Sequence, residues 1–392
     1  MGPSVRAFRG LYGRQKARDP KGRKRRAYLL SPARAWLWRH QRCAAVLLGS
    51  GGRKSRVYPG DNPVSGATIL DPLGLRLSAE EKAFFRDTDP FGFILFARNL
   101  DSPDQIRALC GDLREAVGRA APITIDQEGG RVQRLRAPDW TEWLPPLEHA
   151  TRAGGNAAQA MYLRYRIIAH ELQQLGIDSN CAPLVDVAQD STHPFLKNRC
   201  YGTDAQSVAD LGRAVADGLL DGGVLPVLKH IPGHGRAVAD SHLELPHVDA
   251  DPAELSRIDF APFKALNDLP MGMTAHLVYT QIDPQPATIS AKMMGLIRDQ
   301  IGFDGLIMTD DISMKALSGD LGSLSAAARA AGCDVVLHCN GSLDEKRQVA
   351  EAAGPLDAAG QRRAAAAIAT RKTPAEVDIP ALRAKLDALL NG

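Results

Sequence analysis

Short apolar runs recur along the chain from residue 66 onward, and segments of helical periodicity lie between them. The eight runs are ATIL (67–70), FGFILF (91–96), APITI (121–125), SNCAPLV (179–185), VLPVL (224–228), MGMTA (271–275), GLIMT (305–309) and CDVVL (333–337). Runs that are apolar throughout, rather than alternating with polar residues, are typical of parallel strands buried on both faces. The pattern therefore predicts eight buried strands.

The clearest helical segment covers residues 156–176, where apolar residues recur at steps of three and four. The residues on this apolar face are Met161, Tyr165, Ile168, Leu172 and Leu175. Strands that alternate with helices favour an α/β fold with a parallel sheet. For eight such units we expect a single-domain (β/α)8 TIM barrel over residues 66–392, with a doubly wound open sheet as the alternative.

Polar or ionisable residues follow nearly every predicted strand. In chain order they are Asp71, Arg98 and Asn99, Asp126, Asp186, Lys229 and His230, His276, Asp310, and His338. One such residue could be a helix cap, but a set of this size is hard to explain by capping. Because active sites of (β/α)8 barrels lie at the carboxyl ends of the strands, we expect an active site there.

Titratable residues are densest in KHIPGHGRAVADSH (229–242), which follows the fifth apolar run. The segment holds three histidines, a lysine and an aspartate, and Gly233 and Gly235 allow its loop to bend. GLIMTDDISM, around Asp310, repeats the pattern of a strand followed by acids. Both segments predict catalytic or binding residues at the ends of strands.

Basic charge is concentrated at the N-terminus. Residues 1–60 hold 16 of the 48 lysines and arginines but only one of the 45 acidic residues, and they lack strand or helix periodicity. We expect a basic, disordered extension. It could be a tail attracted to nucleic acid or anionic lipid, an inert extension, or the product of a start codon upstream of the true one. We favour the last two interpretations because no aromatic residues are interleaved with the basic cluster.

The six cysteines form no CxxC pair, which favours reduced thiols in a cytoplasm over a disulfide framework. The longest apolar run near the N-terminus, AAVLL (44–48), is far shorter than the roughly 20 residues of a membrane span. KRRAYLL faintly resembles a twin-arginine export signal, but no apolar core follows it. We therefore expect a cytoplasmic protein.

Five segments together resemble the bacterial β-N-acetylhexosaminidases of glycoside hydrolase family 3, cytoplasmic enzymes of peptidoglycan recycling. They are DQEGGRVQRL (126–135), KHIPGHG with DSH (229–242), MTAHLVY (273–279), PATIS (286–290) and TDDISM (309–314). The combination of KHIPGHG and DSH is highly specific. The resemblance runs from about residue 66 to the C-terminus, and residues 1–60 have no counterpart in it.

The resemblance implies a catalytic role for three residues: Asp310 as nucleophile, His242 as general acid/base and Asp240 as the partner of His242. It also implies that the N-acetylglucosamine ring is contacted by Asp126, Arg134, Arg199, Lys229 and His230. Retaining hydrolysis needs a nucleophile and a proton donor, and a histidine of pKa near 6.5 can both give and accept a proton. The sequence departs from many relatives at Arg236, where they carry an acid, and in HPFLKN before Arg199.

The implied activity is removal of terminal, non-reducing, β-linked N-acetylglucosamine with retention of configuration. The implied substrate is a muropeptide, in which N-acetylglucosamine is joined to anhydro-N-acetylmuramic acid. We expect a monomer with no cofactor, no metal and no nucleic-acid or membrane partner. Alternatives are another family 3 specificity such as β-glucosidase, or a non-catalytic sugar-binding barrel, against which the presence of both Asp310 and His242 argues.

Other interpretations of these residues stay open. Asp310 or Asp311 could merely cap the following helix. His230, His234 and His242 with Asp240 could bind a metal, although ATILDPLG after the first strand lacks the HxH pair usual in barrel metallohydrolases. The basic residues could form ion pairs at the barrel rim. EGGR (128–131) lacks the GK[ST] ending of a phosphate-binding loop.

Overall fold

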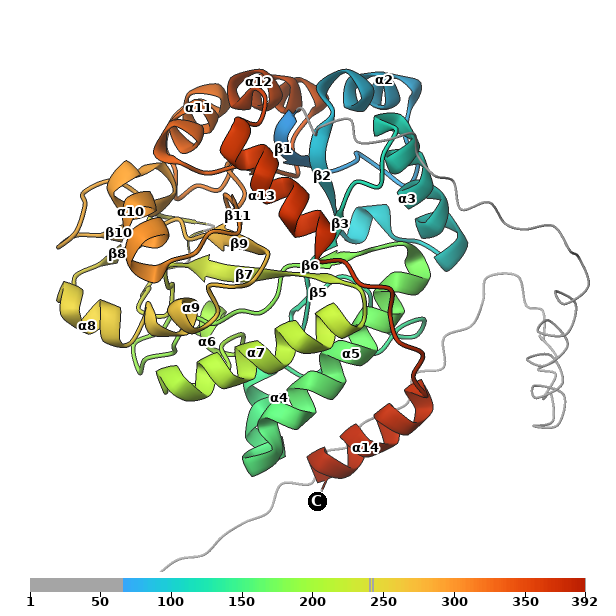
Figure 1. The fold of residues 1–392 in the computed structure, drawn as a ribbon, viewed down its shortest axis with the longest axis vertical. Helices are drawn as coiled ribbons and strands as arrows, with labels where there is room; N and C mark the ends of the chain where they lie inside the picture. Colours follow the sequence, from blue (N-terminus) through green and yellow to red (C-terminus); the bar gives the residue numbers. More distant parts are fainter. Residues whose placement is uncertain (1–65, 240, 242, 392) are drawn as a thin grey trace, which may run out of the picture. The chain divides into compact units, whose positions relative to one another are not determined.

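A computed structural model describes residues 66–239, 241 and 243–391 (Figure 1). Asp240, His242 and the expected extension of residues 1–60 lie outside the described residues.

The centre of the fold is a parallel sheet of eight strands. In chain order they are β1 (Gly66–Leu70), β2 (Pro90–Leu95), β3 (Ile123–Ile125), β6 (Ser179–Asn180), β7 (Leu225–Ile231), β9 (Met271–Thr274), β11 (Leu306–Met308) and β12 (Val336–His338). From β1 to β11 each of these strands pairs with the next one along the chain, and β12 pairs with β1. A parallel bridge between Met308 and Val335 links β11 to the segment that enters β12. The sheet is therefore a nearly closed (β/α)8 barrel, as the apolar runs predicted.

The strands are buried throughout, which is why they read as continuous apolar runs. Every residue of β2 and β7 is buried. The fourth run, predicted over 179–185, forms a strand only at Ser179–Asn180 and returns to the sheet at Leu184, which bridges to Lys229. Pro183 lies between them, and a proline has no N–H to give to a ladder.

Helices surround the barrel (Figure 1). They are α2 (Ala79–Thr88), α3 (Pro103–Val117), α4 (Pro146–Ala153), α5 (Ala157–Leu175), α6 (Pro194–Lys197), α7 (Ala205–Asp221), α8 (Pro252–Arg257), α9 (Ala261–Ala265), α10 (Ala291–Gly295), α11 (Leu321–Ala331), α12 (Leu343–Ala353), α13 (Ala358–Ala369) and α14 (Ile379–Asn391), with a π-helical segment at Leu296–Ile301.

Local sequence signals set the ends of these helices. Ser102 caps α3 by accepting the N–H of Gln105, Pro103 opens the helix, and Gly118 ends it in the left-handed conformation. The predicted helix over 156–176 is α5, and all five residues of its predicted apolar face are buried. Gly176 ends it with φ +83°.

Two small pairings decorate the barrel. β4 (Gln127–Gly129) and β5 (Val132–Gln133) form an antiparallel hairpin directly after β3, and β8 (His247–Val248) pairs with β10 (Val278–Tyr279). The hairpin projects side chains at the carboxyl end of the barrel, where the site lies.

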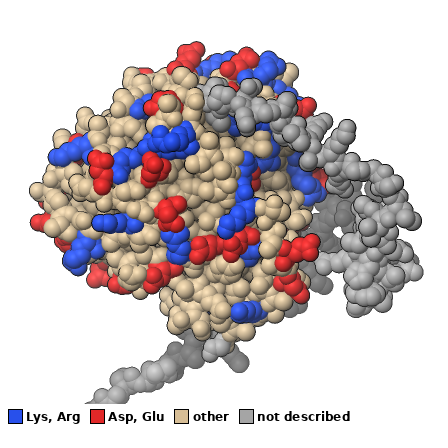
Figure 2. Space-filling model, viewed as in Figure 1, with Lys and Arg blue, Asp and Glu red and all other residues tan. Residues whose placement is uncertain are grey.

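Acidic and basic side chains are interspersed on the face shown in Figure 2. Arg213 pairs with Asp268 on the surface, and Arg363 pairs with Asp304 at 2.9 Å. Among the described residues no helix is long and apolar enough to cross a membrane.

We predict that a protein lacking residues 1–60 keeps the barrel, because β1 begins at Gly66 and pairs with β2 and β12. Its free energy of unfolding in urea should stay within about 0.5 kcal/mol of the full chain. A protein lacking residues 1–70 is the control, because it has lost β1 as well. If the shorter deletion also unfolds the barrel, the predicted domain boundary is wrong.

Candidate functional site

A cavity of about 450 Å³ opens at the carboxyl end of the barrel. It is lined by residues from, or directly after, β2, β3, β7, β9, β11 and β12, and by the β4–β5 hairpin and the loop around α6. The lining includes every predicted site residue that the structure describes: Asp126, Arg134, Arg199, Lys229, His230 and Asp310. Asp126 and Asp310, which are 184 positions apart in the chain, thus meet at one opening.

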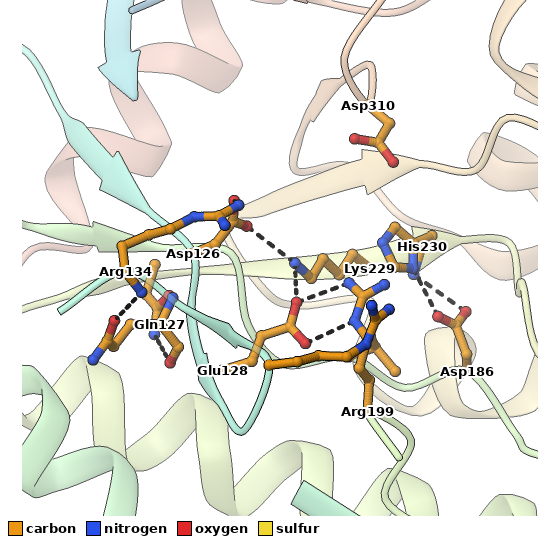
Figure 3. A network of polar contacts seen from close by, with 12 residues as sticks. Asp126, Gln127, Glu128, Arg134, Asp186, Arg199, Lys229, His230 and Asp310 are labelled. Carbon is orange, nitrogen blue, oxygen red and sulfur yellow. Dashed lines mark hydrogen bonds and ion pairs between the residues drawn. The ribbon is translucent and has the colours of Figure 1, made fainter. Parts of the chain in front are cut away.

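Asp126 follows β3 and lies between two cations (Figure 3). Its Oδ2 accepts a hydrogen bond from Arg134 Nη2 at 2.8 Å, and its Oδ1 lies 3.4 Å from Lys229 Nζ. Burial by itself raises the pKa of a carboxyl group, but Lys229 and Arg134 hold the pKa of Asp126 well below its usual range. Asp126 is therefore a fixed anion, able to accept hydrogen bonds from hydroxyl groups.

Arg134 is held by the hairpin that carries it. The side chain of Gln127 accepts the backbone N–H groups of Arg134 and Leu135 at 3.0 and 3.1 Å, and its Nε2 donates to the Leu135 carbonyl at 3.0 Å. The backbone N–H of Gln127 donates to Asn180 Oδ1 in turn at 3.0 Å. The sequence DQEGGRVQR therefore returns the chain so that Arg134 faces Asp126.

Glu128 is a buried carboxylate that the sequence analysis did not include among the site residues. It accepts two hydrogen bonds from Arg199, Nε to Oε2 at 3.0 Å and Nη2 to Oε1 at 2.9 Å, and its Oε1 lies 2.6 Å from Lys229 Nζ (Figure 3). Burial favours the neutral acid, but Arg199 and Lys229 lower the pKa of Glu128 to about 2. The available signal was its position two residues after Asp126 in the same motif.

Arg199 and Lys229 were expected both as substrate contacts and, alternatively, as members of ion pairs. The structure shows the ion pairs, and both side chains also line the cavity. HPFLKN, which differs from relatives, forms α6 and the turn after it, where the Arg199 N–H donates to the Leu196 carbonyl at 2.9 Å. The altered segment therefore still delivers Arg199 to the cavity.

His230 is oriented by Asp186, a strand-end residue that was not predicted as part of the site. His230 Nδ1 lies 2.7 Å from Asp186 Oδ2. Asp186 Oδ1 accepts the backbone N–H groups of His230 and His234 at 3.3 and 2.7 Å. An ionised carboxylate can only accept, so Nδ1 carries the proton and Nε2 of His230 is the nitrogen left for a ligand.

Asp310 and Asp311 are adjacent but differ in their contacts. Asp311 Oδ1 accepts the Ser313 N–H at 3.1 Å, and its Oδ2 accepts the Cys339 thiol at 3.0 Å. The Asp310 carboxylate has an Oδ1 that accepts the N–H of Asp311 at 2.8 Å, and it points toward the side of the site formed by Lys229 and His230 (Figure 3). Both aspartates line the cavity, but neither caps a helix, because the next helix begins at Leu321; Asp311 instead holds the turn at Ser313.

The remaining strand-end histidines are structural. His276 Nε2 lies 3.0 Å from the carbonyl of Asp311, and His338 is buried with Nδ1 3.6 Å from Asp311 Oδ1. Neither lines the cavity formed by the described residues. His193, by contrast, does line it, and its Nδ1 accepts the N–H of Phe195 at 3.2 Å.

The arrangement suits a polyhydroxylated ligand. Charged donors and acceptors form stronger hydrogen bonds than neutral ones, and Asp126, Arg134, Arg199 and Lys229 supply both kinds on one wall. The Asp310 carboxylate also lines the cavity, where it could reach the ligand. No group of three His, Cys, Asp or Glu side chains among the described residues is arranged to hold a metal ion. Asp240 and His242 lie outside those residues, but Ala239 and Ser241 line the cavity.

Comparisons of sequence identify relatives. Residues 65–368 match the family described as "Glycosyl hydrolase family 3 N terminal domain". A protein named "Beta-hexosaminidase" from Alkalilimnicola ehrlichii is 38% identical over 285 residues, which cover 69% of this chain and 81% of that protein. Another of the same name from Pseudomonas aeruginosa is 37% identical over 281 residues, which cover 71% of this chain and 83% of that protein.

Solved structures agree with this result. Native NagZ from Neisseria gonorrhoeae superposes with a TM-score of 0.72 at 30% sequence identity, covering 83% of this chain and 96% of that one. The same protein in complex with N-trifluoroacetyl-D-glucosamine also gives a TM-score of 0.72 at 30% identity, covering 83% of this chain and 98% of that one.

We predict that protonation of His234 destabilises the protein in acid. Burial, and then the neighbouring His230, lower the pKa of His234 from 6.5 to about 4. The neutral ring therefore contributes fully above about pH 6.5, and this contribution, of about 1–3 kcal/mol, is lost as the pH falls toward 4. Urea unfolding between pH 7 and 4.5 measures it.

The variant His234→Gln should show a shallower loss of unfolding free energy over this range. His247 is exposed, so His247→Gln is the matched control and should keep the wild-type slope. Equal slopes in all three proteins would contradict the assignment to His234.

Proposed function

Because the chain belongs to glycosyl hydrolase family 3, we propose that it is a retaining β-N-acetylhexosaminidase that removes terminal, non-reducing N-acetylglucosamine. Relatives named "Beta-hexosaminidase", at 37–38% identity over about 70% of the chain, support this specificity. So does the likeness to NagZ, whose complex with N-trifluoroacetyl-D-glucosamine has nearly the same fold.

One observation carries the proposal for the site. Asp310 lines the same cavity as Asp126, Arg134, Arg199 and Lys229, which offer charged hydrogen-bonding groups on one wall. We assign Asp310 as the nucleophile and the cluster, with His230, as the contacts to the sugar ring. A sugar held by its hydroxyl groups would present its anomeric carbon to a positioned carboxylate.

The proposed reaction has two steps. An Asp310 oxygen forms a bond to the anomeric carbon while the bond to the leaving oxygen breaks, and His242 gives its proton to that oxygen. His242 then takes a proton from water, whose oxygen bonds to the anomeric carbon and releases Asp310. Asp240 would orient His242 and stabilise its charged form. The neighbouring residues Ala239 and Ser241 line the cavity, which supports a role for this loop.

We further propose that the natural substrate is a muropeptide of peptidoglycan recycling, in which the released sugar is N-acetylglucosamine and the remainder carries anhydro-N-acetylmuramic acid. We also propose that the protein acts as a cytoplasmic monomer without a cofactor, and that residues 1–60 are an appendage to the barrel. These finer points rest on the resemblance to family members.

The first test measures the substrate preference of the protein and the role of Asp310. The protein should cleave nitrophenyl N-acetyl-β-glucosaminide much faster than nitrophenyl β-glucoside. Asp310→Ala should lower kcat by about 10⁴-fold or more, because the covalent step loses its nucleophile. Asp311→Ala should retain the covalent step.

Trapping decides which carboxylate reacts. A slow fluorinated N-acetylglucosaminyl fluoride should label Asp310, as peptide mapping by mass spectrometry would show. A label on Asp311 would overturn the assignment, and faster cleavage of the glucoside would overturn the proposed specificity.

A second test concerns His242. Nitrophenolate leaves without a proton, whereas a sugar alkoxide needs one, so His242→Ala should slow cleavage of a natural disaccharide far more than glycosyl-enzyme formation from the nitrophenyl substrate. Asp240→Asn should give a milder form of the same pattern. Pre-steady-state kinetics with both substrates measures it, and equal slowing of the two substrates is the contrary result.

A further inference from the structure

We propose that Glu128 is a positioning residue for sugar recognition, which holds Arg199 and Lys229 in the geometry in which they contact the substrate. The inference rests on the proposed function, because it takes Arg199 and Lys229 as contacts to the sugar. It adds a residue that does not itself face the sugar.

Glu128 is placed to act through its neighbours. Its side chain is only 1% exposed, and it does not belong to the cavity lining formed by the described residues, whereas Arg199 and Lys229 do. Both of its oxygens are used: Oε2 accepts from Arg199 Nε, and Oε1 accepts from Arg199 Nη2 and lies 2.6 Å from Lys229 Nζ. One carboxylate therefore fixes the direction of both cations.

The two cations depend on Glu128 to different degrees. Lys229 has a second anion, Asp126, but at 3.4 Å this contact is longer than the one to Glu128. For Arg199 the ion pair recorded is the one with Glu128, and it is bidentate, which fixes the plane of the guanidinium. Loss of the Glu128 charge should thus misplace Arg199 most.

The backbone of Glu128 is itself clamped. Its carbonyl accepts hydrogen bonds from Arg164 Nη2 and, at 3.2 Å, from Tyr165 Oη, both on α5. The next residue, Gly129, has φ +105°, and a Cβ there would lie 1.8 Å from Arg164 Nη2. A glycine at this position lets Arg164 reach the carbonyl, so α5 fixes the backbone from which the Glu128 carboxylate projects.

The positioning role of Glu128 also has a consequence for the pKa of Lys229. The groups around Lys229 are the carboxylates of Asp126 and Glu128, the Cys181 thiol and the Arg199 guanidinium. Burial by itself lowers the pKa of Lys229, but Glu128 and then Asp126 raise it above its usual value. Removal of the Glu128 charge leaves Lys229 buried beside Arg199 with one carboxylate, so its pKa should fall.

The experiment compares Glu128→Gln, Glu128→Asp and the unmodified protein. Gln keeps the size of the side chain but removes the charge, and Asp keeps the charge but shortens the reach. Glu148→Gln is the matched control, because Glu148 pairs with Arg152 on the exposed face of α4. Circular dichroism and thermal unfolding first establish that each variant is folded.

Two readouts test positioning. The KM for nitrophenyl N-acetyl-β-glucosaminide, and the calorimetric Kd for N-acetylglucosamine, should rise by about 10-fold or more in Glu128→Gln, because the hydrogen bonds from Arg199 and Lys229 to the sugar are weakened when these cations are misplaced. Between pH 7 and 10 the Kd should weaken in Glu128→Gln only, because Lys229 of that variant loses its proton at a lower pH than in the unmodified protein. Glu128→Asp should show the rise in KM without the pH effect, and it decides the matter if Glu128→Gln does not fold.

A merely structural role would reduce the fraction of active protein, so kcat would fall while KM, Kd and their pH dependence stayed unchanged. That result, or wild-type behaviour of Glu128→Gln, overturns the positioning role. Failure of the unmodified protein to cleave any N-acetylglucosaminide overturns the proposed function instead. Normal cleavage with an unchanged Kd in Glu128→Gln overturns only the inference.

Discussion

A charged side chain that is buried on folding needs a partner of opposite charge, and this constraint governs the carboxyl end of the barrel. Glu128, Arg199 and Lys229 are buried, and the half-buried Asp126 and Arg134 pair with each other at the edge of this cluster. An unpaired buried charge costs several kcal/mol, so each member requires the others. The result is a wall of fixed charges with little freedom to rearrange, which suits recognition of hydroxyl groups in fixed directions.

The barrel supplies this match by bringing together distant parts of the chain. Both carboxylates come from the segment directly after β3, whereas Lys229 belongs to β7 and Arg199 follows α6. The cluster forms only when β3, β6 and β7 lie side by side in register. The residues that form ion pairs at the barrel rim are thus the same residues that we propose as contacts to the sugar. Asp186, which follows β6, and His230 of β7 form a further contact between distant parts of the chain.

Much of this could be predicted from the sequence. Continuous apolar runs predict buried parallel strands because both faces of such strands are covered, and all eight runs correspond to strands. The polar residues at the strand ends pointed to the edge of the sheet at which the cavity lies. Glu128 escaped prediction because a carboxylate beside two glycines looks like an ordinary turn residue, and Asp186 because a lone acid after a strand carries no sign of its partner. Their roles depend on cations far away in the chain.

By itself the sequence determined the order of strands and helices, the barrel and the residue types available at its carboxyl end, because burial periodicity and helix caps are local properties. The tertiary structure alone decided which of those residues meet. It held the Asp311 carboxylate in the local turn and directed the Asp310 carboxylate toward Lys229 and His230, and it paired Glu128 with Arg199 and Lys229. Pairing energies depend on distance and burial in space, and neither can be read from separation along the chain.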